Sequence, residues 1–512
     1  MLASLRRLAS HADLARIGYT LKTSSDEQVR QLARRHLALR MGKMRGLPQK
    51  VGQMLSFSQP ASNSADEFAP LLESAEPLAW EIIASELTAA WGQPWSNVIR
   101  QVDPIGHAAS LGQVHEAVLH DGRHVAIKVQ YPGIRDSVRT DLSLLGWLSA
   151  PLGGMRRGFD LAGYRETIMA DLDHELDYLR EAQAQRDFIA VSQDQSFVAI
   201  PAVIEPLCGR NVLVTQWESG ETWETVAANW DEDARRVLGN QMVAWFLRSL
   251  FVDGLVHADL HPGNLRFRQT AKGPVLLLYD FGCVYRPTAV ERFALLRLIQ
   301  ATIDHGENPW PLFMAIGFDA AYLEPLAVKL PALCQALFQP FLAPAVFDAR
   351  DWNLSERVAQ ILGEDRWNFR IAGSPALLLL LRAFHGLKFY LEGLKTPVLW
   401  ERTFSGIWQL TGNEALAMPL PAAPRDEAEF ARLSRHLKIR VEEGGQTKVE
   451  LTCPASAIDE LDALIDADLL AKIQAQGNDL ARLTADVRRR GYVPGPVFEL
   501  VEADKAVRVW LE

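Results

Sequence analysis

Cysteine is scarce in this 512-residue chain, and no two cysteines lie close together. The four are Cys208, Cys283, Cys334 and Cys453, and none belongs to a Cys-x-x-Cys pair. This scarcity argues against a disulfide scaffold and a zinc-ribbon site, and it favours a reducing compartment, the cytoplasm. Long hydrophobic runs are also missing, because the apolar stretch 142–155 is too short to span a bilayer and is broken by proline and glycine.

Positive charge is in deficit over the whole chain but in excess at its start. The chain has 53 Lys and Arg against 63 Asp and Glu, a net charge of −10, and this excess of acid argues against nucleic-acid binding. Residues 1–50 nevertheless carry a net charge of +8, which leaves −18 for the remainder. A basic amphipathic segment is typical of contact with an anionic membrane or acidic partner, of a solvated helix face, or of a mitochondrial presequence. Because its helical pattern continues into 29–53, we treat it as part of the mature fold.

The spacing of apolar residues predicts an alternation of helical and extended regions. Helical spacing over 29–57 predicts a helical N-terminal region, whereas 113–119 and 123–130 predict two strands joined by a turn at Asp121-Gly122. A Pro- and Ala-rich stretch at 418–424 predicts a linker, beyond which a separate α+β unit begins. The other expected elements are strands at 211–217, 275–279, 437–441, 449–451 and 507–511, and helices at 161–192, 233–254 and over most of 290–410.

Three short motifs carry residues that phosphoryl transfer needs. Lys128 ends Val-Ala-Ile-Lys in an apolar strand, where an unpaired ammonium would be costly. The motif His-Ala-Asp-Leu-His-Pro-Gly-Asn places Asp259 five residues before Asn264, and Asp280 opens Asp-Phe-Gly after a buried strand. Phosphoryl transfer uses a cation on the α- and β-phosphates, oxygen ligands on Mg²⁺ and an acid near the attacking group. We assign Lys128 to the first task, Asn264 and Asp280 to the second, and Asp259 to the third, in the order of the kinase signatures.

The segment ahead of the lysine strand lacks the glycines of a usual nucleotide loop. It reads Gly-His-Ala-Ala-Ser-Leu-Gly-Gln-Val over 106–114. Alanine does not readily adopt the positive φ angles that let a Gly-rich loop fold closely over phosphates. We therefore expect this loop to hold nucleotide in a different way, with Ala108, Ala109 and Ser110 as contacts.

Two charged motifs lie outside the kinase signatures. Lys50-Val-Gly-Gln places Lys50 and Gln53 on one helical face. In a helix through 175–182, Asp177 and Glu181 would share a face, and Glu175 would lie about 120° away. Lys128 could then pair with one of these carboxylates and Lys50 with another. Each motif taken alone is also typical of a solvated charge cluster.

Together these motifs resemble the UbiB/AarF/ADCK family of atypical kinases, which includes the mitochondrial coenzyme Q kinases. The resemblance covers residues 25–400, and one departure is His107, which stands where that family has the first alanine of its Ala-rich run. The KxGQ and Ala-rich motifs are the most specific parts. The matching segments are KVGQ (50–53), AASLGQVHEA (108–117), VAIKVQYPG (125–133), ELDYLREA (175–182), HADLHPGN (257–264) and DFG (280–282).

The resemblance implies an α+β, protein-kinase-like fold of two lobes, with an N-terminal helical extension folded over the active site that blocks a peptide substrate. In such a fold Lys128 would pair with Glu181 and contact the phosphates of ATP or ADP, and Lys50 would lie near Glu175. The candidate site residues are then catalytic Asp259, Lys128 and Lys50, nucleotide-binding Ala108, Ala109, Ser110, Lys128, Glu181, Gln53, Glu175 and Asp177, and Mg²⁺-binding Asn264 and Asp280.

The motifs and the linker divide the chain into five expected parts. These are a helical extension at 1–97, a kinase-like N-lobe at 98–220, a C-lobe at 221–415, a Pro/Ala linker at 416–429 and a small α+β domain at 430–512.

The expected function is that of a UbiB-type atypical kinase or ATPase, with ATP and Mg²⁺ as cofactors, which supports ubiquinone or other isoprenoid-lipid metabolism. Its expected partners are nucleotide, an anionic membrane surface, an isoprenoid or quinone lipid and proteins of a biosynthetic complex, with no nucleic acid. Its expected location is the cytoplasm, peripheral to a membrane. One alternative is an aminoglycoside- or choline-kinase-like phosphotransferase. The HADLHPGN motif alone would suit such an enzyme, but enzymes of that kind lack the KxGQ motif. The other is a non-catalytic nucleotide-binding scaffold.

Overall fold

The computed structural model describes most of the kinase-like region and parts of the C-terminal region. The described residues are 77–109, 111–136, 176–304, 307–343, 346–374, 376–421, 436–444, 446–454, 458, 461, 480–489, 495–502 and 505–512. Four candidate site residues lie outside them, namely Lys50, Gln53, Ser110 and Glu175. Most of the expected N-terminal extension lies outside them too. The chain divides into two compact units: Met1–Thr288, Ala343–Ser355 and Pro375–Ile407 form the first, and Ala289–Leu342, Glu356–Ser374 and Trp408–Glu512 the second.

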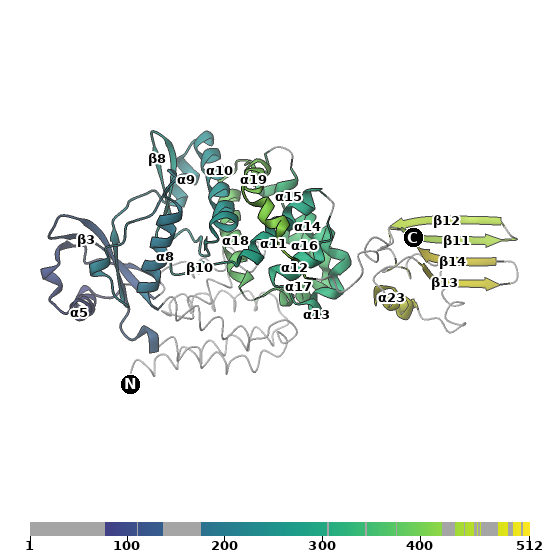
Figure 1. Ribbon diagram of the computed structural model, residues 1–512, viewed down its shortest axis with the longest axis horizontal. Helices are drawn as coiled ribbons and strands as arrows, with labels where there is room; N and C mark the ends of the chain where they lie inside the picture. Colours follow the sequence, from purple (N-terminus) through teal and green to yellow (C-terminus); the bar gives the residue numbers. More distant parts are fainter. Residues whose placement is uncertain are drawn as a thin grey trace, which may run out of the picture. The chain divides into compact units, whose positions relative to one another are not determined.

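A five-stranded sheet lies between two helices in the first unit (Figure 1). Its strands follow the order β1-β3-β4-β6, with β2 paired to β3. Alternation along β4 sends Ile127 into a core with helix α5, while Lys128 points to the opposite face, where Leu213 packs against Tyr178 of helix α8. The elements are α5 (Trp80–Trp91), β1 (Ile99–Val102), β2 (His107–Ala108), β3 (Gly112–Leu119), β4 (His124–Gln130), α8 (Tyr178–Val191) and β6 (Val212–Gln216).

The predicted hairpin between β3 and β4 is confirmed. Val118 pairs with His124, and Gly122 in the turn has φ of 88°, a left-handed conformation that glycine adopts without strain. The same register places Val114 opposite Lys128. The hairpin therefore brings the Ala-rich segment next to the lysine strand.

Helices and short sheets that hold the loops of the sequence motifs make up the rest of the first unit. The motif with Asp259 and Asn264 connects β7 to β8, and Asp280 follows β9. Strand β9 lies between β5 and β8, and β7 pairs with β10. The elements are β5 (Val198–Ala199), α9 (Trp223–Asn229), α10 (Glu232–Arg248) with a π-helical turn (Ser249–Asp253), β7 (Val256–His257), β8 (Leu265–Thr270), β9 (Gly273–Leu278), β10 (Val284–Tyr285), α18 (Leu377–Leu394) and α19 (Trp400–Ala417), which continues past the unit boundary.

The second unit is helical in its first part, as the sequence predicted. Short helices end at proline- and glycine-containing turns, and Gly317 closes α12 in a left-handed conformation. Its helices are α11 (Ala289–Asp304), α12 (Pro309–Ile316), α13 (Ala320–Leu323), α14 (Leu330–Leu337), α15 (Gln339–Leu342), α16 (Leu354–Leu362), which begins just before the unit boundary, and α17 (Arg366–Ala372).

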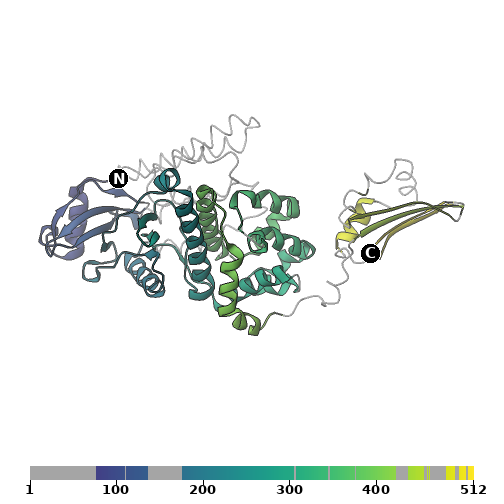
Figure 2. The same cartoon turned by 90° about the horizontal axis from the view of Figure 1, so that it is seen from above.

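The C-terminal residues form a four-stranded antiparallel sheet with the order β12-β11-β14-β13. Figure 2 shows these strands nearly edge-on as one twisted layer. Alternate residues such as Ile439 and Val509 are buried in a core that includes Leu480 of helix α23, which explains the period of two in the sequence. The elements are β11 (His436–Glu443), β12 (Gln446–Pro454), α23 (Leu480–Arg489), β13 (Gly495–Glu502) and β14 (Lys505–Leu511).

The mixed α+β, kinase-like fold expected from the sequence is confirmed, whereas the five domain boundaries stay predictions. Among the described residues, no helix combines the length and the apolar character needed to cross a membrane.

Candidate active site

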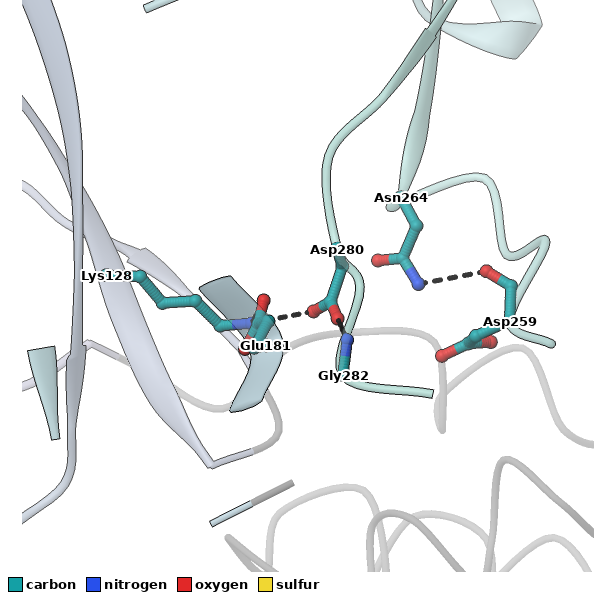
Figure 3. A network of polar contacts seen from close by, with 6 residues as sticks. All are labelled: Lys128, Glu181, Asp259, Asn264, Asp280 and Gly282. Atoms are coloured by element: carbon teal, nitrogen blue, oxygen red, sulfur yellow. Dashed lines mark hydrogen bonds and ion pairs between the residues drawn. The ribbon is translucent and has the colours of Figure 1, made fainter. Parts of the chain in front are cut away.

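Lys128 lies at the centre of the candidate site, between two carboxylates. Its Nζ donates to Glu181 Oε1 at 2.7 Å and to Asp280 Oδ2 at 2.9 Å (Figure 3). The side chains of Glu181 and Lys128 are 2% and 15% exposed, so this ion pair is largely shielded from water. Since β4, α8 and the segment after β9 each supply one partner, three distant parts of the sequence meet at one ammonium. The expected pairing of Lys128 with Glu181 is thus present.

The charge of Lys128 is maintained by its neighbours. Burial by itself would lower the pKa of Lys128, but the carboxylates of Asp280 and Glu181 outweigh it and hold the pKa well above its ordinary value. Tyr178 adds to this environment, since its ring centroid lies 5.0 Å from the ammonium. Lys128 is therefore a permanent cation at physiological pH, suited to a phosphate or a carboxylate.

Helix α8 begins at Tyr178, whereas the sequence interpretation placed Asp177 within the helix. Asp177 has extended backbone angles, and its side chain accepts a hydrogen bond from Leu179 N, so it caps the helix. The interpretation that places Asp177 inside the helix is wrong, because Asp177 is the cap residue, although its carbonyl oxygen accepts from Glu181 N at 3.3 Å. Glu181 lies in the first turn and turns toward Lys128.

The loop with Asp259 and Asn264 is held in place by its own polar groups. His257 is fully buried against Phe188 and Phe281, and its Nδ1 accepts from Asp259 N at 3.2 Å. Burial lowers the pKa of His257, which agrees with a neutral imidazole whose Nδ1 is an acceptor. Asn264 Nδ2 donates to Asp259 O at 3.1 Å, which fixes the amide so that its oxygen points toward Asp280 in Figure 3.

The two residues predicted to bind metal offer the right kind of atoms. Asp280 accepts from Gly282 N through Oδ1 at 2.9 Å, which orients its carboxylate beside the Asn264 amide oxygen (Figure 3). Carboxylate and amide oxygens suit Mg²⁺, which proteins hold with one or two such ligands plus substrate phosphates. Within the described residues, no cluster of three or more His, Cys, Asp or Glu could hold a metal without such help. The donor set therefore fits a metal that arrives with a nucleotide.

Two of the three predicted nucleotide-loop residues are described. Ala108 lies in β2, and Ala109 N donates to Gly112 O at 2.8 Å across the turn into β3. Gly112 packs so closely against Val129 that a Cβ there would lie 2.2 Å from Val129 O. The turn is thus pressed against the strand that carries Lys128.

Sequence reasoning missed Arg382, which contacts Asp259. Arg382 Nη2 lies 2.6 Å from Asp259 Oδ1, with side chains 9% and 17% exposed, and Arg382 Nη1 lies 3.8 Å from Cys283 Sγ. The arginine projects from α18, where it follows five leucines. An arginine inside such an apolar helix needs an acidic partner, and that was the available signal.

A comparison with protein families identifies the region that holds this site. The family model described as the ABC1 atypical kinase-like domain matches residues 70–309. Residues 70–309 are thus similar to the ABC1 atypical kinase-like domain. The matched range includes every residue of the site described in this subsection except Arg382, whereas the candidate residues Lys50 and Gln53 precede it. The match confirms the resemblance to the atypical kinases.

Named relatives agree with the ABC1 assignment. The atypical kinase COQ8B, mitochondrial, of Rattus norvegicus is 31% identical over 244 residues, which are 47% of this chain and 46% of the rat protein. The atypical kinase COQ8, mitochondrial, of Saccharomyces cerevisiae is 26% identical over 335 residues, 63% of this chain and 66% of the yeast protein. The match thus spans less than half of the rat relative's own length.

A solved structure supports the fold. The Mycobacterium tuberculosis protein Rv3197, solved in complex with erythromycin, has a TM-score of 0.52 and 23% identity, and the match covers 72% of this chain and 93% of that one. At this identity the likeness concerns the fold alone.

The contact of α18 with the ABC1 domain gives a first prediction. A Cβ on Gly386 would lie 2.6 Å from Leu260 Cβ and 3.0 Å from Leu260 O, inside the loop that carries Asp259. Gly386→Ala should therefore destabilise the protein by about 1–3 kcal/mol, since α18 must move away from the loop. Thermal unfolding measures this. Gly406→Ala is the control, because a Cβ there meets no atom within 4 Å, and equal melting temperatures for the two variants would contradict the prediction.

Proposed function

We propose that this chain is a Mg²⁺-dependent, ATP-using atypical kinase or ATPase of the UbiB type. The observation that carries the proposal is the contact of Lys128 with both Glu181 and Asp280. Phosphoryl transfer in protein kinases requires a strand lysine paired with a helix glutamate, and an Asp-Phe-Gly aspartate positioned to hold Mg²⁺. The names of the rat and yeast relatives support the same class.

Each residue of the site has a distinct task in this proposal. Lys128 contacts the α- and β-phosphates, and Glu181 fixes the direction of its ammonium. Asn264 and Asp280 hold Mg²⁺, which neutralises charge on the phosphates when it is bound. Asp259 orients the attacking hydroxyl or water and accepts its proton.

We place the substrate in isoprenoid-lipid metabolism, including that of ubiquinone, at an anionic membrane surface, where proteins of a biosynthetic complex are further partners. The net charge of +8 in residues 1–50 supports contact with anionic lipid. Lys50 and Gln53 remain proposed site residues that enter the pocket from this region, with Lys50 near Glu175. Ala108, Ala109 and Ser110 remain proposed nucleotide contacts, and Asp177 a neighbour of the site.

The test is Mg²⁺-dependent ATP hydrolysis with and without anionic liposomes. We expect slow hydrolysis in buffer and faster hydrolysis with liposomes that contain anionic lipid, but not with neutral ones. Replacing Arg6, Arg7 and Arg16 by Glu should remove the stimulation and leave the rate in buffer unchanged. Lys50→Ala should change the rate in buffer, since Lys50 is proposed to enter the pocket.

The other outcomes of this assay identify the alternatives. Nucleotide binding without turnover under every condition would favour a non-catalytic scaffold. Phosphorylation of a soluble alcohol or antibiotic alone would favour a small-molecule phosphotransferase. Liposome stimulation that survives the triple Arg→Glu replacement would remove the basic segment from the proposal.

A further inference from the structure

The strand that leads into the Ala-rich turn contains an irregularity opposite His115. Val102 pairs with Ala117 and His107 pairs with Val114, so four residues, 103–106, face only two residues of β3. Such a bulge sets the register of everything that follows it on the strand. The position of Ala108 and of the turn after it thus depends on how the bulge is filled.

Two fully buried polar side chains fill the bulge. His115 Nδ1 lies 2.9 Å from Asp103 O, and Gln113 Nε2 lies 2.8 Å from His115 Nε2. Both side chains are 0% exposed. Gly106 packs directly on them, because a Cβ there would lie 2.8 Å from both Gln113 Nε2 and the His115 ring. The bulge backbone therefore rests on this pair.

The same pair reaches the chain that enters helix α5. Gln113 Oε1 accepts from Leu78 N at 2.7 Å, and Gln113 Nε2 donates to Leu78 O at 3.1 Å. Trp80, the first residue of α5, packs edge-on against His115, and the two ring centroids are 4.9 Å apart. Gln113 thus forms two hydrogen bonds with the backbone of Leu78 and a third hydrogen bond with His115.

These contacts determine the protonation of His115. The amide nitrogen of Gln113 has two hydrogens, and they go to Leu78 O and to His115 Nε2. His115 Nε2 is then an acceptor, so the ring is neutral and carries its proton on Nδ1, which donates to Asp103 O. A proton on Nε2 would set two donors against each other and break the contact.

We propose that Gln113 and His115 are positioning residues of the nucleotide site, which fix the Ala-rich turn on the lysine strand and tie it to the chain at Leu78. The inference rests on the proposed nucleotide binding and adds two residues to it. The turn is placed by the bulge on one side and by the pairing of Val114 with Lys128 on the other. Loss of the pair should therefore weaken nucleotide binding more than it slows the chemical step.

The pair also makes the turn sensitive to acid. Burial lowers the pKa of His115, and among the charged groups that face it Asp103 opposes this shift and His107 adds to it. In the native contact the pKa of His115 lies below its ordinary value of 6.5. A form in which the His115 contacts are broken therefore binds a proton more readily, and the contact is weakened as the pH falls below 6.5. The KM for ATP should rise over this range.

The experiment compares His115→Leu, His115→Asn and Gln113→Met with the native chain. His115→Leu and Gln113→Met should raise the KM for MgATP about tenfold, the effect of one lost buried hydrogen bond, with kcat within about threefold of native. His115→Asn keeps a donor for Asp103 O, so it should recover part of the loss and show no rise of KM between pH 7 and 5.5. His120→Leu, in the exposed hairpin turn, is the control.

Hydrogen exchange gives a readout that needs no nucleotide. In His115→Leu and Gln113→Met, peptides that cover 77–80 and 103–109 should exchange faster together, while peptides from β6 should be unchanged. If the native chain does not bind ATP, the proposed function fails. The exchange experiment still tests whether Gln113 and His115 link segment 77–80 to segment 103–109. Native KM and native exchange in a folded Gln113→Met variant would overturn the inference, including the case in which His115→Leu does not fold.

Discussion

Asp280→Asn is expected to lower Mg²⁺-dependent ATP hydrolysis about 10³-fold while the protein stays folded. A metal ion contributes several kcal/mol to phosphoryl transfer, and each 1.36 kcal/mol corresponds to a factor of ten. Asparagine keeps an oxygen that can accept from Gly282 N, and Lys128 keeps Glu181 as its partner. The loss should therefore come from weaker metal binding, measured as a large increase in the Mg²⁺ concentration that gives half-maximal rate.

Asp121→Asn is the matched control for this substitution. Asp121 lies in the exposed β3–β4 turn and pairs only at the surface with Arg123, where an ion pair contributes little. The control should keep the native rate and Mg²⁺ dependence. If Asp280→Asn hydrolyses ATP at the native rate, Asp280 is not a metal ligand and the proposed catalytic arrangement is wrong.

The kinase-like site could be predicted where each residue belongs to a short motif. Lys128, Asn264 and Asp280 are marked by neighbours in sequence, and the structure brings Lys128 and Asp280 into contact although 152 positions separate them. The hairpin was predictable for a similar reason, because a two-residue turn fixes the register of its strands. In these cases the residue types within each short motif were enough for the prediction, because the fold brings the motifs together.

Contacts that depend on distant packing could not be predicted in the same way. Arg382 reaches Asp259 only because α18 packs against the loop at Gly386, and no spacing in the sequence encodes that approach. The start of α8 was misplaced because an aspartate is compatible with both a first turn and a cap, and the bond to Leu179 N decides between them. The contacts of His115 that fill the bulge could not be predicted either, because they join residues from separate segments, Asp103 and Gln113.

Arg382→Met is expected to reduce both stability and turnover. Methionine occupies a similar volume but leaves the Asp259 carboxylate, which is 17% exposed, without the guanidinium. Removal of one partner of a buried ion pair costs about 3–5 kcal/mol, because an uncompensated charge stays behind. The cost should appear as a lower melting temperature and, since Asp259 loses its orientation, as a kcat lower by about tenfold or more with little change in the KM for ATP. Arg382→Lys should restore part of kcat.

The double variant separates the ion pair from packing. Asp259→Asn removes the charge that Arg382 compensates, so Arg382→Met should cost less stability in that background than in the native chain. We expect the two substitutions to be non-additive by about 1–3 kcal/mol, as for residues in direct contact. Additive losses would mean that Arg382 stabilises α18 through its aliphatic stem alone. In that case Asp259 would be oriented by the backbone contacts of its loop, the bonds from Asp259 N to His257 and from Asn264 to Asp259 O.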